Sequence, residues 1–210
     1  MRYAANSVGS AYLPKLLGIY ERELTPMVET ACARKPRLIV DVGAAEGYYA
    51  VGLGIKNSGA RIVAFEMDPK GRAALHEMAR INNVRERIEI RGKCEQEDLR
   101  VVLAAEVATL IVCDVEGYEE NLLDPQAVPV LRGAMILAEM HEFILPGITQ
   151  LLRKRFEGTH KVERVWQEPR SREEFPWRTL GTALLPKSYL DWAVSEWRPE
   201  RMSWLWMEPK

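Results

Sequence analysis

Between residues 37 and 140, short apolar runs of strand length alternate with longer segments whose apolar residues follow helical spacing. Strands separated by helices form a parallel sheet with helices on both faces, because each connection must cross over the sheet. The expected strands lie at 38–40, 61–65, 87–91, 110–113 and 134–138, and the expected helices at 48–56, 69–81, 95–105 and 116–123. The sequence therefore predicts a doubly wound α/β fold.

Two further regions flank these elements. Residues 1–36 form an N-terminal flank, and apolar residues at helical spacing predict an amphipathic helix over 13–33, near the sheet edge. On the C-terminal side, the predicted elements are a helix and two alternating strands, at residues 148–156, 161–166 and 202–207. The segment 168–200 is rich in Pro, Arg and Trp and too long for an ordinary connection, so we expect a lid or a helical insertion there.

Length and composition agree with a single globular domain. A chain of 210 residues, 47% of them hydrophobic, is able to bury one core, and this composition excludes a disordered chain. We expect one domain over 1–210, made of the flank, a core at 37–167, the insertion at 168–200 and a last strand within 201–210.

Charge and cysteine content narrow the classes of partner. The formal net charge is -1, so no global positive field attracts nucleic acid or anionic lipid. The three cysteines lie far apart without a CxxC pair, which disfavours a zinc site or a disulfide framework and suits a reducing compartment. No apolar run has the length of a membrane span, and residues 1–14 lack the pattern of a signal peptide. We therefore expect a cytoplasmic protein without a nucleic-acid or membrane partner.

The loop after the first predicted strand, residues 41–48, contains two glycines and two acids. Glycines allow the backbone to approach a ligand at the carboxyl ends of the strands, where open α/β sheets bind theirs. A dinucleotide site needs neutral surroundings for its pyrophosphate, whereas Asp41 and Glu46 would repel it by roughly 1 to 4 kcal/mol per charge pair. A cationic ligand without phosphate, such as S-adenosylmethionine (SAM), suits this loop better.

Other candidate cofactor residues follow the next two strands. Glu66 ends the second strand, where an acid accepts hydrogen bonds from ribose hydroxyls, and Met67 beside it either lies against the adenine or packs internally. Cys94 and Glu95 follow the third strand, where an adenine edge would lie. Glu95 fits either an acceptor for the adenine amine or an acid at the start of a helix.

Four titratable residues follow the fourth and fifth predicted strands. Asp114 and Glu116 end the fourth strand, and period-two alternation places Glu139 and His141 on one side of the fifth, next to it. A carboxylate or an imidazole near a hydroxyl is able to remove its proton during attack on a methyl group, and the same groups are able to ligate a divalent metal. We interpret all four as candidate catalytic residues, with a purely structural role at a strand end as the alternative for His141, and we predict no metal site.

The segment from Asp41 to His141 resembles the FkbM-like branch of the class I SAM-dependent methyltransferases. Three motifs carry this resemblance: Asp41-Val-Gly-Ala-Ala-Glu-Gly-Tyr48, Phe65-Glu-Met-Asp-Pro69 and Asp114-Val-Glu-Gly-Tyr-Glu119. Leu131-Arg-Gly-Ala134 followed by Glu139-Met-His141 also fits that branch. The resemblance implies a Rossmann-like sheet of seven strands, mostly parallel, whose final antiparallel pair is formed by 161–167 and 202–207.

For function, the resemblance implies a SAM-dependent O-methyltransferase that acts on a hydroxyl of a small molecule or sugar. Asp114 would face the amino or methyl end of the cofactor, and Glu66 would hold its ribose. The residues that would frame its methionine end belong to the first motif: Asp41, Gly43, Ala45, Gly47 and, beside them, Glu46 and Tyr48. The chain departs from the branch at Ala44-Ala45 and at Tyr118, which stands where a small residue is usual and narrows the expected acceptor pocket.

All six tryptophans lie between Trp166 and Trp206. Trp204 and Trp206 alternate onto one face of the last strand, which indicates core packing. Within the insertion, tryptophans are interspersed with arginines, at Trp177, Trp192, Trp197, Arg170, Arg172, Arg178 and Arg198. Such a mixture suits an acceptor pocket or a surface cap equally well, and the net charge disfavours single-stranded nucleic acid.

Two alternatives to a methyltransferase stay open. A nicotinamide-dependent (NAD) oxidoreductase would use the same architecture, although the acids of the glycine loop disfavour it. A binding module that retained the fold without catalysis would keep the same motifs. The sequence leaves the oligomeric state and the identity of the acceptor undetermined.

Overall fold

The computed structural model describes residues 1–4, 8, 10–104 and 107–210. Seven strands form one sheet in the order β3-β2-β1-β4-β5-β7-β6. Their bounds are β1 Leu38–Val42, β2 Arg61–Phe65, β3 Ile88–Arg91, β4 Thr109–Cys113, β5 Met135–Met140, β6 His160–Trp166 and β7 Ser203–Pro209. Strands β1 to β5 pair in parallel, and β7 pairs antiparallel with β5 and β6. The predicted doubly wound sheet with a final antiparallel pair is confirmed.

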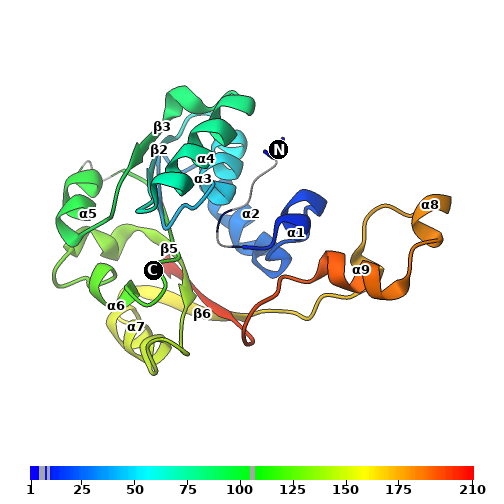
Figure 1. Cartoon of the computed structure of the whole chain (residues 1–210). Coiled ribbons are helices and arrows are strands. Elements are labelled where there is room, and N and C mark those ends of the chain that lie inside the picture. Colours follow the sequence, from blue (N-terminus) through cyan, green and yellow to red (C-terminus); the bar gives the residue numbers. More distant parts are fainter. Residues whose placement is uncertain (5–7, 9, 105–106) are drawn as a thin grey trace.

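The central strands are buried because helices cover both faces of the sheet (Figure 1). Helices α2 (Thr25–Ala33), α3 (Tyr48–Lys56) and α4 (Pro69–Ile81) pack into one core. Helices α5 (Gln96–Leu103), α6 (Glu119–Leu122) and α7 (Ile148–Phe156) pack into the core on the other face. In register, Val42 pairs with Phe65 on one side and with Cys113 on the other, so three strands end at the same level.

Most helix bounds agree with the predicted ones. Helices α3, α4 and α7 span the predicted residues, and α4 begins where the Asp68 side chain accepts a hydrogen bond from the Lys70 amide and Pro69 occupies the first turn. Helix α6 starts at Glu119 rather than 116, because Glu116 and Gly117 both have positive φ and continue the loop after β4. The predicted end of α5 at residue 105 lies outside the described residues.

The N-terminal flank differs from the prediction. In place of one helix over 13–33, the chain forms α1 (Tyr12–Leu17), a 3-10 turn (Arg22–Leu24) and α2. Gly18 ends α1 in the left-handed conformation, and Glu21 is left-handed as well, so the path turns twice between the helices. These turns carry the flank across the carboxyl ends of the strands, where its side chains reach the interior.

The chain between β6 and β7 projects from the body and carries α8 (Leu180–Ala183) and α9 (Lys187–Val194), with α8 at its tip (Figure 1). We call residues 168–200 the arm. Trp204 and Trp206 of β7 are buried, as the alternation predicts. Among the described residues, no helix is long and apolar enough to cross a membrane.

Candidate functional site

A cavity of about 350 Å³ lies at the carboxyl ends of β1, β2 and β4. The ends of these strands and the loops that follow them and β3 supply many of its lining residues, among them Asp41, Gly43, Ala45, Glu66, Met67, Cys94, Asp114 and Glu116. The N-terminal flank and the arm close its other side with Lys15, Tyr20, Glu21 and Arg198. The cavity therefore lies where open α/β sheets bind their ligands, and two remote segments complete it.

The backbone turn after β1 requires glycine at position 43. Gly43 has a φ of 84°, and a Cβ atom there would lie 1.6 Å from the carbonyl oxygen of Asp114. The amides of Gly43 and Ala44 both donate to the carbonyl oxygen of Phe65, at 2.9 Å each. The ends of β1, β2 and β4 thus lie close together, and only glycine fits between them. At position 43 the turn therefore presents backbone, without a side chain, to the cavity.

Glu66 is fixed by backbone donors. Its Oε2 accepts a hydrogen bond from the Ala45 amide at 2.8 Å, and its Oε1 accepts one from the Asp68 amide at 2.7 Å. A Cβ atom on Gly71 would approach the Glu66 side chain to 2.7 Å, so α4 also confines it. Glu66 is 9% exposed and lines the cavity, which gives a preorganised acceptor at the position predicted to meet a ribose.

Asp41 lies within β1 and is only 2% exposed. Its Oδ2 accepts a hydrogen bond from the Ala50 amide in α3 at 2.8 Å. Burial raises the pKa of Asp41 to about 7, and the nearby carboxylates of Asp114 and Glu66 act in the same direction. A positive ligand in the cavity would relieve this penalty on the ionised form.

Glu46 and Gly47 do not line the cavity in the part of the chain that the structure describes. The Glu46 carboxylate is buried, lies 2.5 Å from the Nζ atom of Lys15, and accepts hydrogen bonds from the Tyr3 hydroxyl and the Val8 amide. Its charge is therefore neutralised by the flank, and the argument that it repels a diphosphate is wrong. Of the two acids in the loop, Asp41 alone faces the cavity.

Gly47 is required by helix packing. Its φ is 93°, and a Cβ atom there would lie 2.1 Å from Leu75 Cδ1 in α4. Its position therefore reflects the approach of α4 to the start of α3, whereas the neighbouring Tyr48 lines the cavity. A glycine selected by packing and one selected by ligand approach look alike in the sequence.

Glu95 also lies outside the cavity lining. It is the N-cap of α5, where its side chain forms a capping box with Asp98, and it accepts a hydrogen bond from the Tyr118 hydroxyl at 2.8 Å. Its neighbour Cys94 lines the cavity, and burial raises the pKa of that thiol to about 12. Met67 is largely exposed at the cavity mouth.

The structure brings the four predicted catalytic residues together. His141 Nε2 lies 3.5 Å from Asp114 Oδ1 and 3.4 Å from Glu116 Oε2. Single ligand atoms of Asp114, Glu139 and His141 all lie within 4.8 Å of one another, a spacing that would suit a divalent cation. Asp114 and Glu116 line the cavity, whereas Glu139 and His141 lie behind them and are buried.

His141 is oriented by a residue that the sequence did not single out. Its Nδ1 atom lies 2.6 Å from Glu119 Oε1, and because a carboxylate only accepts, Nδ1 carries the proton. Glu119 is completely buried, and its Oε2 has no hydrogen-bond partner among the described residues. Burial lowers the pKa of His141, but its hydrogen bond to Glu119 and the carboxylates of Asp114, Glu119 and Glu116 outweigh that effect, so the net pKa is raised.

Asp114 has a pKa near neutrality. Its side chain keeps 42% of its surface open to the cavity, yet protein surrounds the group, and this desolvation raises its pKa to about 6 against the opposing effect of His141. Burial also raises the pKa of Glu139, helped by the carboxylates of Asp114 and Glu21 and opposed by Arg198.

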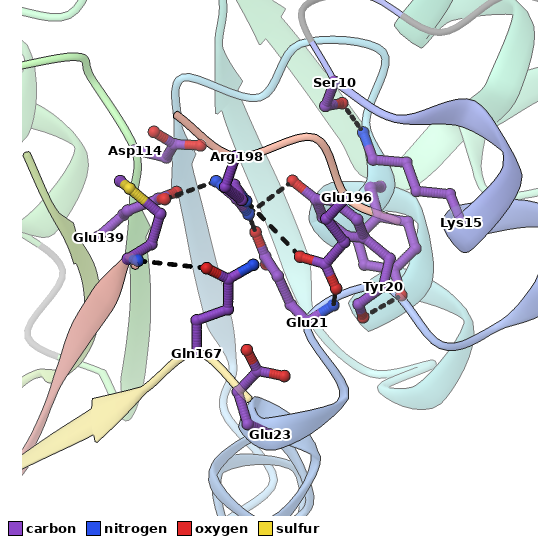
Figure 2. Close-up of polar contacts among 12 residues, drawn as sticks. Ser10, Lys15, Tyr20, Glu21, Glu23, Asp114, Glu139, Gln167, Glu196 and Arg198 are labelled. Carbon is purple, nitrogen blue, oxygen red and sulfur yellow. Dashed lines mark hydrogen bonds and ion pairs between the residues drawn. The ribbon is translucent and has the colours of Figure 1, made fainter. Parts of the chain in front are cut away.

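Arg198 joins three parts of the chain at the cavity wall (Figure 2). Its Nη1 atom donates to Glu139 Oε1 in β5 at 2.6 Å, and its Nη2 atom donates to the Tyr20 hydroxyl at 3.0 Å and to Glu21 in the flank. Glu196 Oε2 lies 3.5 Å from its Nε. The guanidinium is thus enclosed by carboxylates from β5, the flank and the arm itself.

Lys15, Tyr20 and Glu21 of the flank line the cavity but were not predicted as site residues, and Arg198 was predicted only as one of several arginines of an acceptor pocket. Nothing in the local sequence marks them, because their positions follow from two turns in the flank and from the return of the arm. The arm's exposed tryptophans, Trp177, Trp192 and Trp197, do not line the cavity among the described residues. Of the arm's arginines only Arg198 does, so the predicted Trp-Arg acceptor pocket is reduced to this one side chain.

No protein-family profile matches this sequence, and no curated protein matches it in sequence. Solved structures do match the fold. The O-methyltransferase of Bacillus cereus in complex with SAH (S-adenosylhomocysteine) is 13% identical to this chain, with a TM-score of 0.56. The match covers 90% of this chain and 81% of that one. The O-methyltransferase TomG of Streptomyces achromogenes in complex with SAM is 14% identical with a TM-score of 0.54, over 93% and 79%.

A third match is TYW2 of Pyrococcus horikoshii in complex with MeSAdo, 14% identical with a TM-score of 0.52 over 90% of this chain. The chain spans only 61% of the length of TYW2 and of a second transferase structure from that organism. At these identities the comparisons establish the fold: the chain has the Rossmann-like fold of SAM-dependent methyltransferases.

Proposed function

We propose that this protein is a SAM-dependent methyltransferase. The observation that carries the proposal is the cavity at the carboxyl ends of β1, β2 and β4, which Asp41, Glu66 and Asp114 all line around the close approach of Gly43 to β4. The lining holds five acids, Glu21, Asp41, Glu66, Asp114 and Glu116, against three cations, Lys15, Lys93 and Arg198. This excess of acids favours a ligand whose net charge is positive and which carries no phosphate. The O-methyltransferase structures with SAH and SAM bound support the same cofactor class here.

The residues present fit such a cofactor. Glu66, with both oxygens fixed by backbone amides, would accept hydrogen bonds from ribose hydroxyls. Asp41 and the backbone from Gly43 to Ala45 would hold the methionine end, and Asp114 would meet its positive groups. Met67 and Cys94, which also line the cavity, would border the adenine end. When bound, SAM supplies an electrophilic methyl group.

We further propose that the acceptor atom is a hydroxyl oxygen of a small molecule or sugar. A hydroxyl must lose its proton as it attacks, and a base is most effective when its pKa lies near the working pH. Asp114, with a pKa of about 6 and an open face toward the cavity, fits this requirement. Its carboxylate would take the hydroxyl proton.

His141 would act from behind Asp114 and Glu116 as a positioning residue. Its Nε2 faces both carboxylates, and Glu119 holds its Nδ1. Because His141 is only 2% exposed, an acceptor in the cavity meets the carboxylates before the imidazole. The Glu119–His141 pair would keep both carboxylates oriented, and His141 in its neutral form would accept the abstracted proton from Asp114 at Nε2.

Cofactor binding is tested first, by isothermal calorimetry with S-adenosylhomocysteine and with NAD as the comparison. We expect one molecule of S-adenosylhomocysteine per chain and no heat from NAD. Binding of NAD alone would replace this proposal with the oxidoreductase alternative.

Methyl transfer is tested next, by an activity screen against hydroxylated sugars and natural-product scaffolds with and without Mg²⁺. On an acceptor found this way, Glu116→Gln and His141→Gln should lower kcat while the Kd for S-adenosylhomocysteine stays unchanged. Glu119→Gln should lower kcat less and shift the pH profile. Full activity of a variant would remove that residue from the proposed chemistry, and absence of transfer to every acceptor would favour a binding module.

A further inference from the structure

The arm exposes a large apolar surface outside the cavity. Leu180, the first residue of α8, and Leu184, which follows its last residue, are 89% and 86% exposed, and α8 lies at the tip of the arm, far from the body (Figure 1). Five further large apolar side chains of the arm are exposed, namely Trp177, Leu185, Tyr189, Trp192 and Trp197. A concentration of apolar side chains on a projecting element is typical of an interaction surface.

The aromatic residues of the arm already form an ordered row. Tyr189 stacks on Trp192 with 5.7 Å between ring centroids, and Trp192 meets the edge of Trp197 at 6.3 Å. Trp197 has a φ of 54°, a rare conformation for a bulky residue, and it lies between Glu196 and Arg198, which are held in the interior. The buried ion pairs thus fix the root of the arm while the indole of Trp197 faces outward.

We propose that the occupant of this surface is the arm of a second copy of the chain, packed antiparallel. Exposed side chains of this size offer about 800 Å² of apolar area per arm, which equals what one partner contributes to a standard protein interface. Two identical arms form an isologous contact, in which one patch meets itself across a two-fold axis. The area is therefore sufficient for a stable dimer.

The charges of the arm favour this partner. Residues 175–190 near the tip carry two cations, Arg178 and Lys187, and no acid, whereas exposed acids lie toward the root at Glu168 and Glu200. Antiparallel packing brings the tip of each arm against the root of the other and pairs these opposite charges. The arm as a whole carries five cations and six acids, so it lacks the positive charge that would attract an anionic membrane.

The test is the mass in solution, by light scattering after gel filtration at several micromolar concentrations. We expect the wild-type chain at twice its monomer mass and the double variant Leu180→Glu/Leu184→Glu at monomer mass. Val101→Glu is the matched control, because Val101 is also an exposed aliphatic residue but lies on α5, away from the arm, and this variant should stay dimeric. Both leucines are exposed in the single chain, so the variant should remain folded.

A mixing experiment tests the geometry. A tagged double variant should fail to capture wild-type chain, because an isologous contact needs both arms. Capture would mean that one arm binds the body of its partner and would overturn the arm-to-arm contact. A wild-type monomer at every concentration would overturn the dimer itself, and binding of that monomer to phosphatidylserine vesicles would assign the apolar tip to a membrane instead.

Discussion

The two sides of the cavity are built in different ways. On the side of β1 and β2, Gly43, Ala45 and Glu66 are held by backbone hydrogen bonds within the single stretch 43–66. On the side of β5, Arg198 is held by Glu139, Glu21 and Tyr20, which are 59, 177 and 178 positions away. One side is a local motif, and the other is a meeting of three distant segments.

The difference also concerns charge. The first side fixes a carboxylate with neutral amide donors, whereas the second encloses a guanidinium among carboxylates that are themselves buried. Arg170, Glu23 and Glu196 extend this network to the root of the arm. Breaking a buried ion pair leaves an uncompensated charge and is strongly destabilising. We therefore expect Arg198 on the second side to act mainly on stability and Glu66 on the first side to act mainly on ligand affinity.

The largest expected effect is that of Arg198→Met. It leaves Glu21 and Glu139 without their cation and should lower the free energy of unfolding by about 3 to 5 kcal/mol, measured by urea denaturation. Arg178→Met is the matched control, because Arg178 is exposed on the arm, and it should change stability by less than about 0.5 kcal/mol. Equal effects of the two variants would mean that the Arg198 network adds no stability.

The second-largest expected effect is a difference between wild type and Asp41→Asn in how the free energy of unfolding depends on pH. A pKa raised to about 7 means that the folded state binds the Asp41 proton more tightly than the unfolded state does. The contribution of Asp41 to the free energy of unfolding is therefore most favourable below pH 4 and becomes less favourable as pH rises to 7. Relative to the variant, the wild type should lose at most about 4 kcal/mol over this range. The difference should level off above pH 7, and parallel pH profiles of the two proteins would contradict the burial of this charge.

The third prediction concerns cofactor affinity on the local side. Glu66→Gln should weaken binding of S-adenosylhomocysteine by about 1 to 3 kcal/mol, or about 5- to 150-fold, because charged hydrogen bonds are lost. Glu97→Gln on the exposed face of α5 is the control and should leave the Kd unchanged. Calorimetry at one pH measures both, and an unchanged Kd in Glu66→Gln would remove the ribose role.

The smallest expected effect is that of Glu95→Gln. Because Glu95 lies outside the cavity lining and caps α5, its replacement should change the Kd for S-adenosylhomocysteine by less than about threefold. The melting temperature should fall slightly through the weakened cap. A loss of affinity as large as that of Glu66→Gln would return Glu95 to the cofactor site.

The sequence predicts the local side well because its signals are short-range. Alternating strands and helices, the Asp68 cap with Pro69, and an acid at the end of β2 each depend on neighbouring residues. The cluster of Asp114 and His141 was also predictable, since adjacent parallel strands end at the same edge. The position of Glu46 was not, because the loop pattern does not reveal that Lys15 pairs with it.

The other side depends on contacts that no local pattern encodes. The flank reaches the cavity only because the chain turns at Gly18 and Glu21, and an apolar periodicity over 13–33 hides both turns. Arg198 looked like one arginine among several in a Trp-rich segment, yet burial against Glu139 and Glu21 distinguishes it. Long-range ion pairs of this kind require the fold to be known first.

The most direct measurement is calorimetric titration of the wild-type chain with S-adenosylhomocysteine, next to the same titration of Glu66→Gln. The account predicts one binding site per chain in the wild type and an affinity that is about 5- to 150-fold weaker in the variant. A cooperative thermal unfolding transition would first show that the wild-type chain is folded. If this folded chain did not bind S-adenosylhomocysteine, the result would contradict the central claim that this cavity holds the cofactor of a methyltransferase.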